Sequence, residues 1–122
     1  MIQVLKAIND GLQAIGINYQ FMEWTDAIVY PYFIGEYENV GSINEDGMSE
    51  STFILTGTTR GTWVELETMK EQIVEYFEDR RVMADNGNGI VFNYDRAFVV
   101  PTGDQDLKRI QINLQIKEWK VN

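Results

Sequence analysis

The sequence contains no histidine and no cysteine. Without histidine there is no Ser-His-Asp triad, no Cys-His pair and no imidazole ligand for a metal. Without cysteine there is no thiolate nucleophile, no disulfide framework and no cysteine-bound zinc. No run of about 18 apolar residues occurs, so we expect no membrane-spanning helix. Lys6 and Asp10 interrupt the first 15 residues, so we expect no signal peptide there.

Basic residues are also scarce. Lysine and arginine number 10 against 19 aspartate and glutamate residues, which gives a net charge of -9. No basic residue occurs from Ala7 to Thr59. Because phosphate neutralisation needs a basic surface, we expect no direct nucleic-acid binding, sequence-specific or otherwise. The acidic surface has two interpretations: it keeps the protein soluble, or it repels DNA or meets a basic partner.

The length and composition predict one domain over residues 1–122, with no linker and no repeat. A chain of 122 residues buries about two-thirds of its surface on folding, and 44% of these residues are hydrophobic. Apolar residues recur every three or four positions in residues 2–15, which predicts an amphipathic helix that stops at Gly16. Residues 28–38 are β-branched and aromatic and predict a strand, with Pro31 at its start or on an edge.

The rest of the chain continues this alternation of element types. Residues 51–59 predict a second strand, joined to the first by an acidic hairpin tip at 39–50. A second helix follows, because Thr62 and Glu65 have capping-box spacing. An apolar stripe runs on to Phe77.

The end of that helix and the last strands complete the pattern. Arg80 and Arg81 are expected to close the helix in its last turn. A loop at 85–89 leads into a strand over 90–100, broken near Asp95, and residues 110–116 alternate strictly between apolar and polar. The order α-β-β-α-β-β predicts an α+β fold, an antiparallel sheet with two helices packed on it.

No residue pattern indicates catalysis or metal binding. Glu65, Glu67 and Glu71 do not share one helix face, and the two Asp/Asn-Gly loops lack the glutamate of a calcium-binding EF-hand. Residues 57–61 resemble a phosphate loop but lack its Gly-Lys-Ser/Thr ending, so we interpret them as a tight connector. We therefore assign no catalytic residue, no metal ligand and no cofactor.

Aromatic residues gather around the first predicted strand. Period-two alternation places Tyr30 and Tyr32 on one face and Phe33 and Tyr37 on the other. This pattern fits either a core face with half-buried tyrosines or a face that another subunit buries. Trp119 continues the polar face of the last strand and is either an interface residue or part of a packed C-terminus.

The chain resembles a family of small tail proteins of tailed bacteriophages and prophages. These are the tail-terminator, tail-completion and head–tail joining proteins. The resemblance rests on the Tyr-Pro-Tyr strand of residues 29–37, a Thr/Ser-rich second strand, the element order and the chain length. It covers the chain from about Val4 to Trp119 and contains no catalytic signature.

The resemblance implies a non-enzymatic subunit of a homo-oligomeric ring, usually a hexamer. The ring would terminate the tail tube and join it to the head connector. It implies assembly in the cytoplasm of the bacterial host and a final location in the virion tail, without a membrane. The candidates for the oligomer interface are Trp24, Tyr30, Tyr32, Tyr37, Arg60 and Trp119. The candidates for loops that face partner proteins are Asn44, Glu45, Asp46, Asp85, Asn86 and Asn88.

Two other functions remain open. The first is an acidic interaction module of a mobile element that mimics DNA and inhibits a DNA-binding enzyme, which the basic gap from Ala7 to Thr59 favours. The second is an enzyme or small-ligand binder that uses carboxylates and tyrosines. A deep pocket containing an acid with a raised pKa would favour the second.

Overall fold

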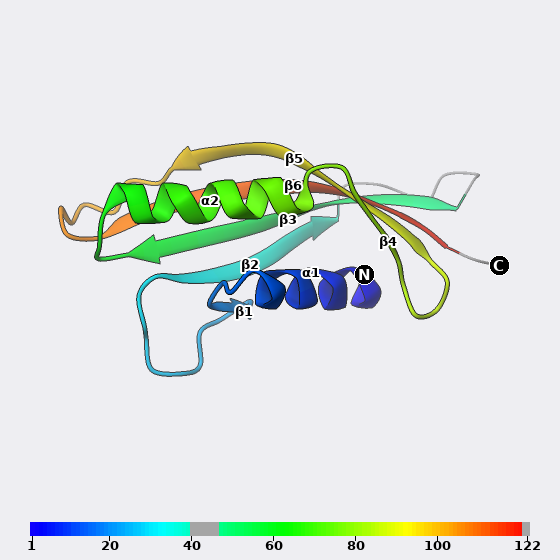
Figure 1. The fold of residues 1–122 in the computed structure, drawn as a ribbon, viewed down its shortest axis with the longest axis horizontal. Coiled ribbons are helices and arrows are strands. Elements are labelled where there is room, and N and C mark those ends of the chain that lie inside the picture. The colour runs from blue at the N-terminus through cyan, green and yellow to red at the C-terminus, as the bar shows by residue number, and fades with distance from the viewer. Residues whose placement is uncertain (40–46, 121–122) are drawn as a thin grey trace.

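The computed structural model describes residues 1–39 and 47–120 of the chain (Figure 1). Two helices pack on a six-stranded sheet, so the predicted α+β class is confirmed. The strand order across the sheet is β1-β2-β3-β6-β5-β4. The elements are α1 (Ile2–Ala14), β1 (Tyr19–Phe21), β2 (Tyr32–Asn39), β3 (Met48–Thr59), α2 (Trp63–Phe77), β4 (Arg80–Met83), β5 (Gly89–Val99) and β6 (Lys108–Trp119).

The prediction of a wholly antiparallel sheet is wrong, because β1 pairs in parallel with β2. The predicted element order lacked β1, which is only three residues long, and the observed order is α-β-β-β-α-β-β-β. A parallel pair needs a connection that returns the chain to the starting edge. Residues 22–31 make that connection, and we call them the arm. The other four strand pairs are antiparallel.

The second correction concerns the end of α2. Arg80 and Arg81 do not close the helix but begin β4, a strand that the sequence did not predict. The helix stops at Phe77 because the next residue, Glu78, is extended and Asp79 adopts a positive φ of 53°. Asp tolerates this left-handed backbone better than most residues, so the chain can reverse there.

Several boundaries follow local signals in the sequence. Gly16, predicted to stop α1, has a φ of 76°. Thr62 caps α2, and its Oγ1 accepts a hydrogen bond of 3.1 Å from the Glu65 amide. A register shift between Tyr94 and Arg96 marks the predicted break near Asp95. The first long strand begins at Tyr32 and not at residue 28, because residues 28–31 belong to the arm.

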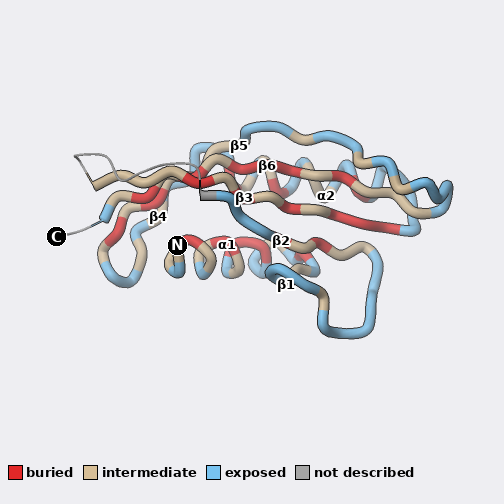
Figure 2. Tube along the Cα trace, turned by 180° about the vertical axis from the view of Figure 1, so that it is seen from behind, coloured by how far each residue is buried: buried red, intermediate tan, exposed pale blue. Residues whose placement is uncertain are grey.

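The core lies between the two helices and one face of the sheet. Phe33 and Phe53 are fully buried there, and their rings lie against Gly57 and Gly35. A Cβ at either glycine would come within 2.3 or 2.4 Å of a ring carbon, so these positions require glycine. Figure 2, drawn from behind, shows the opposite face of β3, β6 and β5 with no helix in front of it.

The sheet has two ends that gather different segments. At the end that we call the arm end, Tyr32 lies beside Thr58, and the arm, the start of α2 and the β5–β6 turn lie nearby (Figure 1). At the end that we call the Trp119 end, Trp119 lies between Met48 of β3 and Gly89 of β5. Of the predicted interaction residues, Trp24, Tyr30, Tyr32 and Arg60 lie at the arm end, and Asp85, Asn86, Asn88 and Trp119 lie at the Trp119 end.

Candidate protein-interaction site

The arm is held to the sheet by the side chain of Gln20. Its Oε1 accepts hydrogen bonds from the Thr25 amide at 3.0 Å and from the Thr25 hydroxyl at 3.2 Å. Its Nε2 donates a bond of 2.6 Å to the Asp26 carboxylate. Gln20 lies in β1, the short edge strand, so one side chain of the sheet fixes the first half of the arm.

Further hydrogen bonds fix the second half of the arm. Asn18 Nδ2 donates to the Val29 carbonyl at 3.1 Å, and the indole nitrogen of Trp24 donates to the Ala27 carbonyl at 3.3 Å. Met22 begins the arm with a positive φ of 69°, while its amide donates to the carbonyl of Gly35 in β2. The arm therefore has a defined shape that local hydrogen bonds maintain.

Three aromatic rings and one guanidinium meet where the arm joins β2. The ring of Trp24 lies 5.0 Å from that of Tyr32, and Tyr32 lies 5.7 Å from Tyr30. The guanidinium of Arg60 lies 5.7 Å from the centre of the Tyr30 ring. These residues, all predicted interface candidates, come from three separate stretches of the chain. We call them the arm cluster.

Arg60 links the arm cluster to the β5–β6 turn. A hydrogen bond to the Tyr30 hydroxyl and the nearby Asp104 carboxylate raise the pKa of the Arg60 guanidinium above its ordinary value. The guanidinium lies 3.5 Å from the carboxylate, and about half of each side chain is exposed, at 50% and 45%. Water therefore screens the ion pair, and its main effect is to position Arg60 over the tyrosine.

The arm presents apolar side chains to solvent. Met22, Ile28 and Val29 are 61%, 52% and 65% exposed. A hollow of about 490 Å³ lies between the arm and α2. Its lining consists of Gly16, Asn18, Trp24, Asp26, Ala27, Val29, Tyr30, Pro31 and Met69. Adjacent exposed apolar groups rimmed by polar residues are typical of a protein-interaction surface.

The two other predicted interface residues lie elsewhere. Tyr37 projects from the end of β2, where its ring stacks on Phe21 at 6.2 Å with an interplanar angle of 10°. Trp119 ends β6 at the opposite end of the sheet and is half-buried. It shares a sheet face with Lys117, as the alternation predicted, but it is not near the arm cluster.

The predicted partner-facing loop lies at the Trp119 end and is tied to neighbouring segments. Asp85 is ion-paired with Lys6 of α1, and the contact lowers the pKa of the carboxyl and raises that of the amine. Asn86 Oδ1 accepts a 3.0 Å hydrogen bond from the Asn88 amide, which is buried. The remaining loop candidates, Asn44, Glu45 and Asp46, lie outside the described residues.

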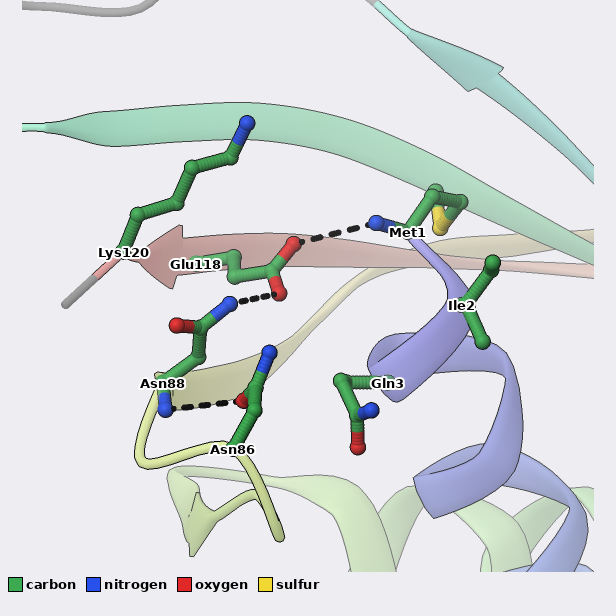
Figure 3. Close-up of a pocket in the computed structure, with 7 residues that line it drawn as sticks. All are labelled: Met1, Ile2, Gln3, Asn86, Asn88, Glu118 and Lys120. Carbon is green, nitrogen blue, oxygen red and sulfur yellow. Dashed lines mark hydrogen bonds and ion pairs between the residues drawn. The ribbon is translucent and has the colours of Figure 1, made fainter. Parts of the chain in front are cut away.

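Sequence reasoning missed a buried carboxylate beside this loop. Glu118 is only 5% exposed, and its two oxygens accept bonds from the Met1 ammonium at 3.3 Å and Asn88 Nδ2 at 2.9 Å (Figure 3). These groups line an open hollow of about 430 Å³ together with Ile2, Gln3, Asn86 and Lys120. One signal was present: the alternation of β6 continues past Ile116 and places Glu118 on the core face.

Two of the three glutamates considered as metal ligands, Glu65 and Glu67, have other partners. Glu65 Oε1 accepts a 2.9 Å bond from the Thr59 hydroxyl, and Glu67 is ion-paired with Lys70. Among residues 1–39 and 47–120, no three His, Cys, Asp or Glu side chains come close enough to hold a metal ion. No helix in the same ranges is long and apolar enough to cross a bilayer. The surface of the arm end is made of aromatic, apolar and hydrogen-bonding groups.

Comparison with known proteins gave no match to a protein-family model and none to a curated protein sequence.

Proposed function

We propose that this chain is a non-enzymatic assembly protein of a tailed bacteriophage or prophage. It forms a ring that terminates the tail tube and joins it to the head connector. One observation supports the proposal most directly. Trp24, Tyr30, Tyr32 and Arg60, chosen from the sequence as interface candidates, lie together in the arm cluster. Tryptophan, tyrosine and arginine are the residue types most enriched in the energetic centres of protein interfaces.

The mechanism is geometric. The arm projects beyond one edge of the sheet (Figure 1), and in the proposed ring it contacts a different surface of the next copy. A contact between two different surfaces is heterologous, and repeated rotation about one axis closes such contacts into a ring. Burial of Met22, Ile28 and Val29 in that contact would remove apolar surface from water.

The net charge of -9 fits a channel through which DNA passes. A wall without basic patches cannot neutralise phosphates, so DNA would slide along it without binding. The location follows from the same role: the subunit assembles in the host cytoplasm and remains in the virion tail.

The test is the mass of the protein in solution, measured by light scattering across concentration with and without Mg²⁺. Negative-stain imaging would follow on any large species. We expect closed rings of about six subunits, the usual number in the proteins that the sequence resembles. A strict monomer that also fails to assemble on purified tail tubes would contradict the proposal.

A matched pair of variants tests the arm cluster. Tyr32→Asp places a charge among the rings of Trp24 and Tyr30, and we expect loss of assembly with the fold retained. Gln72→Asp adds the same charge on the exposed side of α2 and should leave assembly unchanged. If Tyr32→Asp still assembles and still complements tail joining, the arm cluster is not the interface.

A DNA-mimicking inhibitor is the second candidate. Glu67, Glu71 and Glu75 form a row along the exposed side of α2, roughly one helical turn apart, and a repeat of this kind approaches the spacing of phosphates. Lys70 neutralises the first member of the row. Specific co-purification of the monomer with a basic DNA-binding enzyme of the host would favour this function over the ring.

A further inference from the structure

The edge of the sheet formed by β5 is open over half its length. β4 pairs with β5 only from Gly89 to Phe92, so among the described strands the rest of β5 pairs with β6 alone. The amide of Val100 donates to a β6 carbonyl at 3.0 Å, which shows that Val100 faces β6. Backbone groups alternate in direction along a strand, so those of Ala97 and Val99 point outward.

These outward groups are available to another strand. Tyr94, also on the open edge, has its amide satisfied by a 3.0 Å bond to Glu78 Oε2. The amides of Ala97 and Val99 have no such partner within residues 1–39 and 47–120. An exposed row of unpaired amides and carbonyls is a template for pairing with a further strand.

The opposite edge of the sheet is β1. Asn18 accepts a hydrogen bond from β2 at 2.8 Å and the Met22 amide donates one to β2 at 2.7 Å, so both residues face β2. By the same alternation, the backbone groups of Tyr19 and Phe21 point away from β2. The Phe21 carbonyl accepts a 2.8 Å hydrogen bond from the Glu23 amide, so the two amides and the Tyr19 carbonyl are the outward groups that β1 offers to another strand. The molecule therefore has outward-pointing backbone groups at both edges.

The two edges match in strand direction and in register, which we describe by rows of residues paired across the sheet. Following the strand pairs across the sheet, Val99 lies in the row of Tyr19 and Ala97 lies in the row of Phe21. β1 is parallel to β2, and each step from β2 through β3 and β6 to β5 is antiparallel, so β5 runs opposite to β1. A second copy displaced sideways by one sheet width would present its β5 antiparallel to β1.

We infer that β5 of one copy adds to β1 of the next copy and continues the sheet from subunit to subunit. The inference rests on the proposed ring function and names the surfaces that close the ring. Strand addition supplies main-chain hydrogen bonds, and the side chains on both faces determine which partner fits. The contact joins two different edges, as a ring requires.

The side chains on the uncovered face are complementary in charge. Arg96 lies on that face of β5, and the strand pairs place it in the row of Glu36 in β2. Both side chains are exposed, and neither forms a salt bridge with any described residue. Glu36 follows directly after the stretch that β1 covers, so Arg96 of a neighbouring β5 would lie in its row, two strand spacings or about 10 Å away along the backbone, a distance that the two long side chains can shorten. Opposite charges across an interface fix its register.

The side chains on the helix-bearing face are complementary in polarity. Val99 of β5 is 57% exposed, and Trp63 at the start of α2, which lines the same hollow, is 44% exposed. On the β1 side, Phe21 is 36% exposed and the apolar arm follows it directly in the chain. Apolar surface thus meets apolar surface on this face, while opposite charges meet on the other.

The backbone contact is tested with Val99→Pro. Proline removes an outward-pointing amide, a substitution that edge strands tolerate because that amide takes no part in the ladder. We expect sedimentation velocity of the full chain to show monomer for Val99→Pro and wild-type rings for the control Val99→Ala, which keeps the amide. Urea unfolding of both variants checks that the fold is retained.

The charge contact is tested by a swap, which does not depend on how the backbone tolerates proline. Arg96→Glu should weaken self-association at least about tenfold, and adding Glu36→Arg in the same chain should restore most of that loss. Failure of the second substitution to rescue assembly would overturn the predicted register.

The outcomes separate this inference from the proposed function. If the wild type forms rings and Val99→Pro forms them equally well, the β5–β1 contact is wrong and the ring function stands. If the wild type stays monomeric at every concentration, with or without tail tubes, both are overturned. The contact is established if Val99→Pro abolishes the rings and if Glu36→Arg restores the association that Arg96→Glu weakens.

Discussion

The arm end and the Trp119 end of the sheet differ in which side chains they bury. At the arm end, Trp24 and Tyr30 remain at the surface, and hydrogen bonds from Gln20 and Asn18 hold the backbone around them. At the Trp119 end, the polar group is the buried one. Glu118 lies inside the fold and receives an ammonium and an amide.

This difference predicts that the Trp119 end affects folding and that the arm end affects association. A buried charge contributes to stability only while its partners remain in place, so the Trp119 end is sensitive to small changes in the fold. Exposed apolar groups cost little in the free chain and gain when another surface covers them. We therefore expect substitutions at the Trp119 end to change folding, and substitutions at the arm end to change association.

The largest expected effect is that of Glu118→Ala. The substitution removes the buried carboxylate that accepts hydrogen bonds from Asn88 Nδ2 and from the Met1 ammonium. We expect a loss of about 3 kcal/mol in the free energy of unfolding, measured with urea at neutral pH. The control Glu71→Ala removes an exposed carboxylate from α2 and should change stability by less than about 0.5 kcal/mol. Equal losses in the two variants would contradict a special role for Glu118.

The next effect compares glycines toward the two ends of the sheet. Gly57→Ala places a Cβ 2.3 Å from the buried Phe33 ring and should cost about 2 kcal/mol of stability. Gly89→Ala, at the Trp119 end, has no atom within 4 Å of the new Cβ. It should leave the free energy of unfolding unchanged or raise it by up to about 1 kcal/mol, because alanine restricts the unfolded chain. A comparable cost for both would mean that Phe33 does not rest on Gly57.

Much of the fold was predictable because the signals are local. The apolar stripe of α1, the cap at Thr62 and the alternation of β6 each act within one element, and all are observed. What failed depended on contacts between distant segments. β1 and β4 are three and four residues long, too short for periodicity, and they are strands because β2 and β5 pair with them.

The sequence suggested which residues to consider for the candidate site, but it did not show which of them lie together. Trp24, Tyr30 and Tyr32 are close in sequence, so their clustering could be expected, whereas Arg60 joins them only because β3 lies beside β2. Trp119 is remote because the register sets it at the other end of the sheet. The hydrogen bonds of the arm depend on side-chain directions that no period in the sequence encodes.

The pH dependence of stability in the alkaline range tests the burial of Tyr19, which lies in β1 just before the arm. Burial raises the pKa of Tyr19 to about 12, against about 10 in the unfolded chain. The neutral ring therefore stabilises the fold fully below about pH 10, and this contribution is lost as the pH rises through about 12. A shift of this size on a half-buried side chain corresponds to about 1 kcal/mol after allowance for solvent.

Tyr19→Phe removes this dependence. We expect the stability of the wild type to fall more than that of Tyr19→Phe between about pH 9 and about pH 11, by about 0.5 kcal/mol, which is half of the full loss. Tyr37→Phe, which removes a hydroxyl from an exposed ring, is the matched control and should follow the wild type. Parallel curves for all three proteins would mean that water reaches the Tyr19 hydroxyl.

The smallest global effect, and the sharpest local one, is expected from Gln20→Ala. Its hydrogen bonds to Thr25 and Asp26 join the arm to β1, but all of them lie at the surface. The free energy of unfolding should change by less than about 1 kcal/mol, because water replaces exposed hydrogen bonds. Hydrogen exchange of the Thr25 amide should quicken at least about fivefold, since its acceptor is removed. Gln13→Ala, on the exposed side of α1, should alter neither measurement. An unchanged rate for the Thr25 amide would show that the arm keeps its shape without Gln20, and the contrast between the two ends would then rest on the Trp119 end alone.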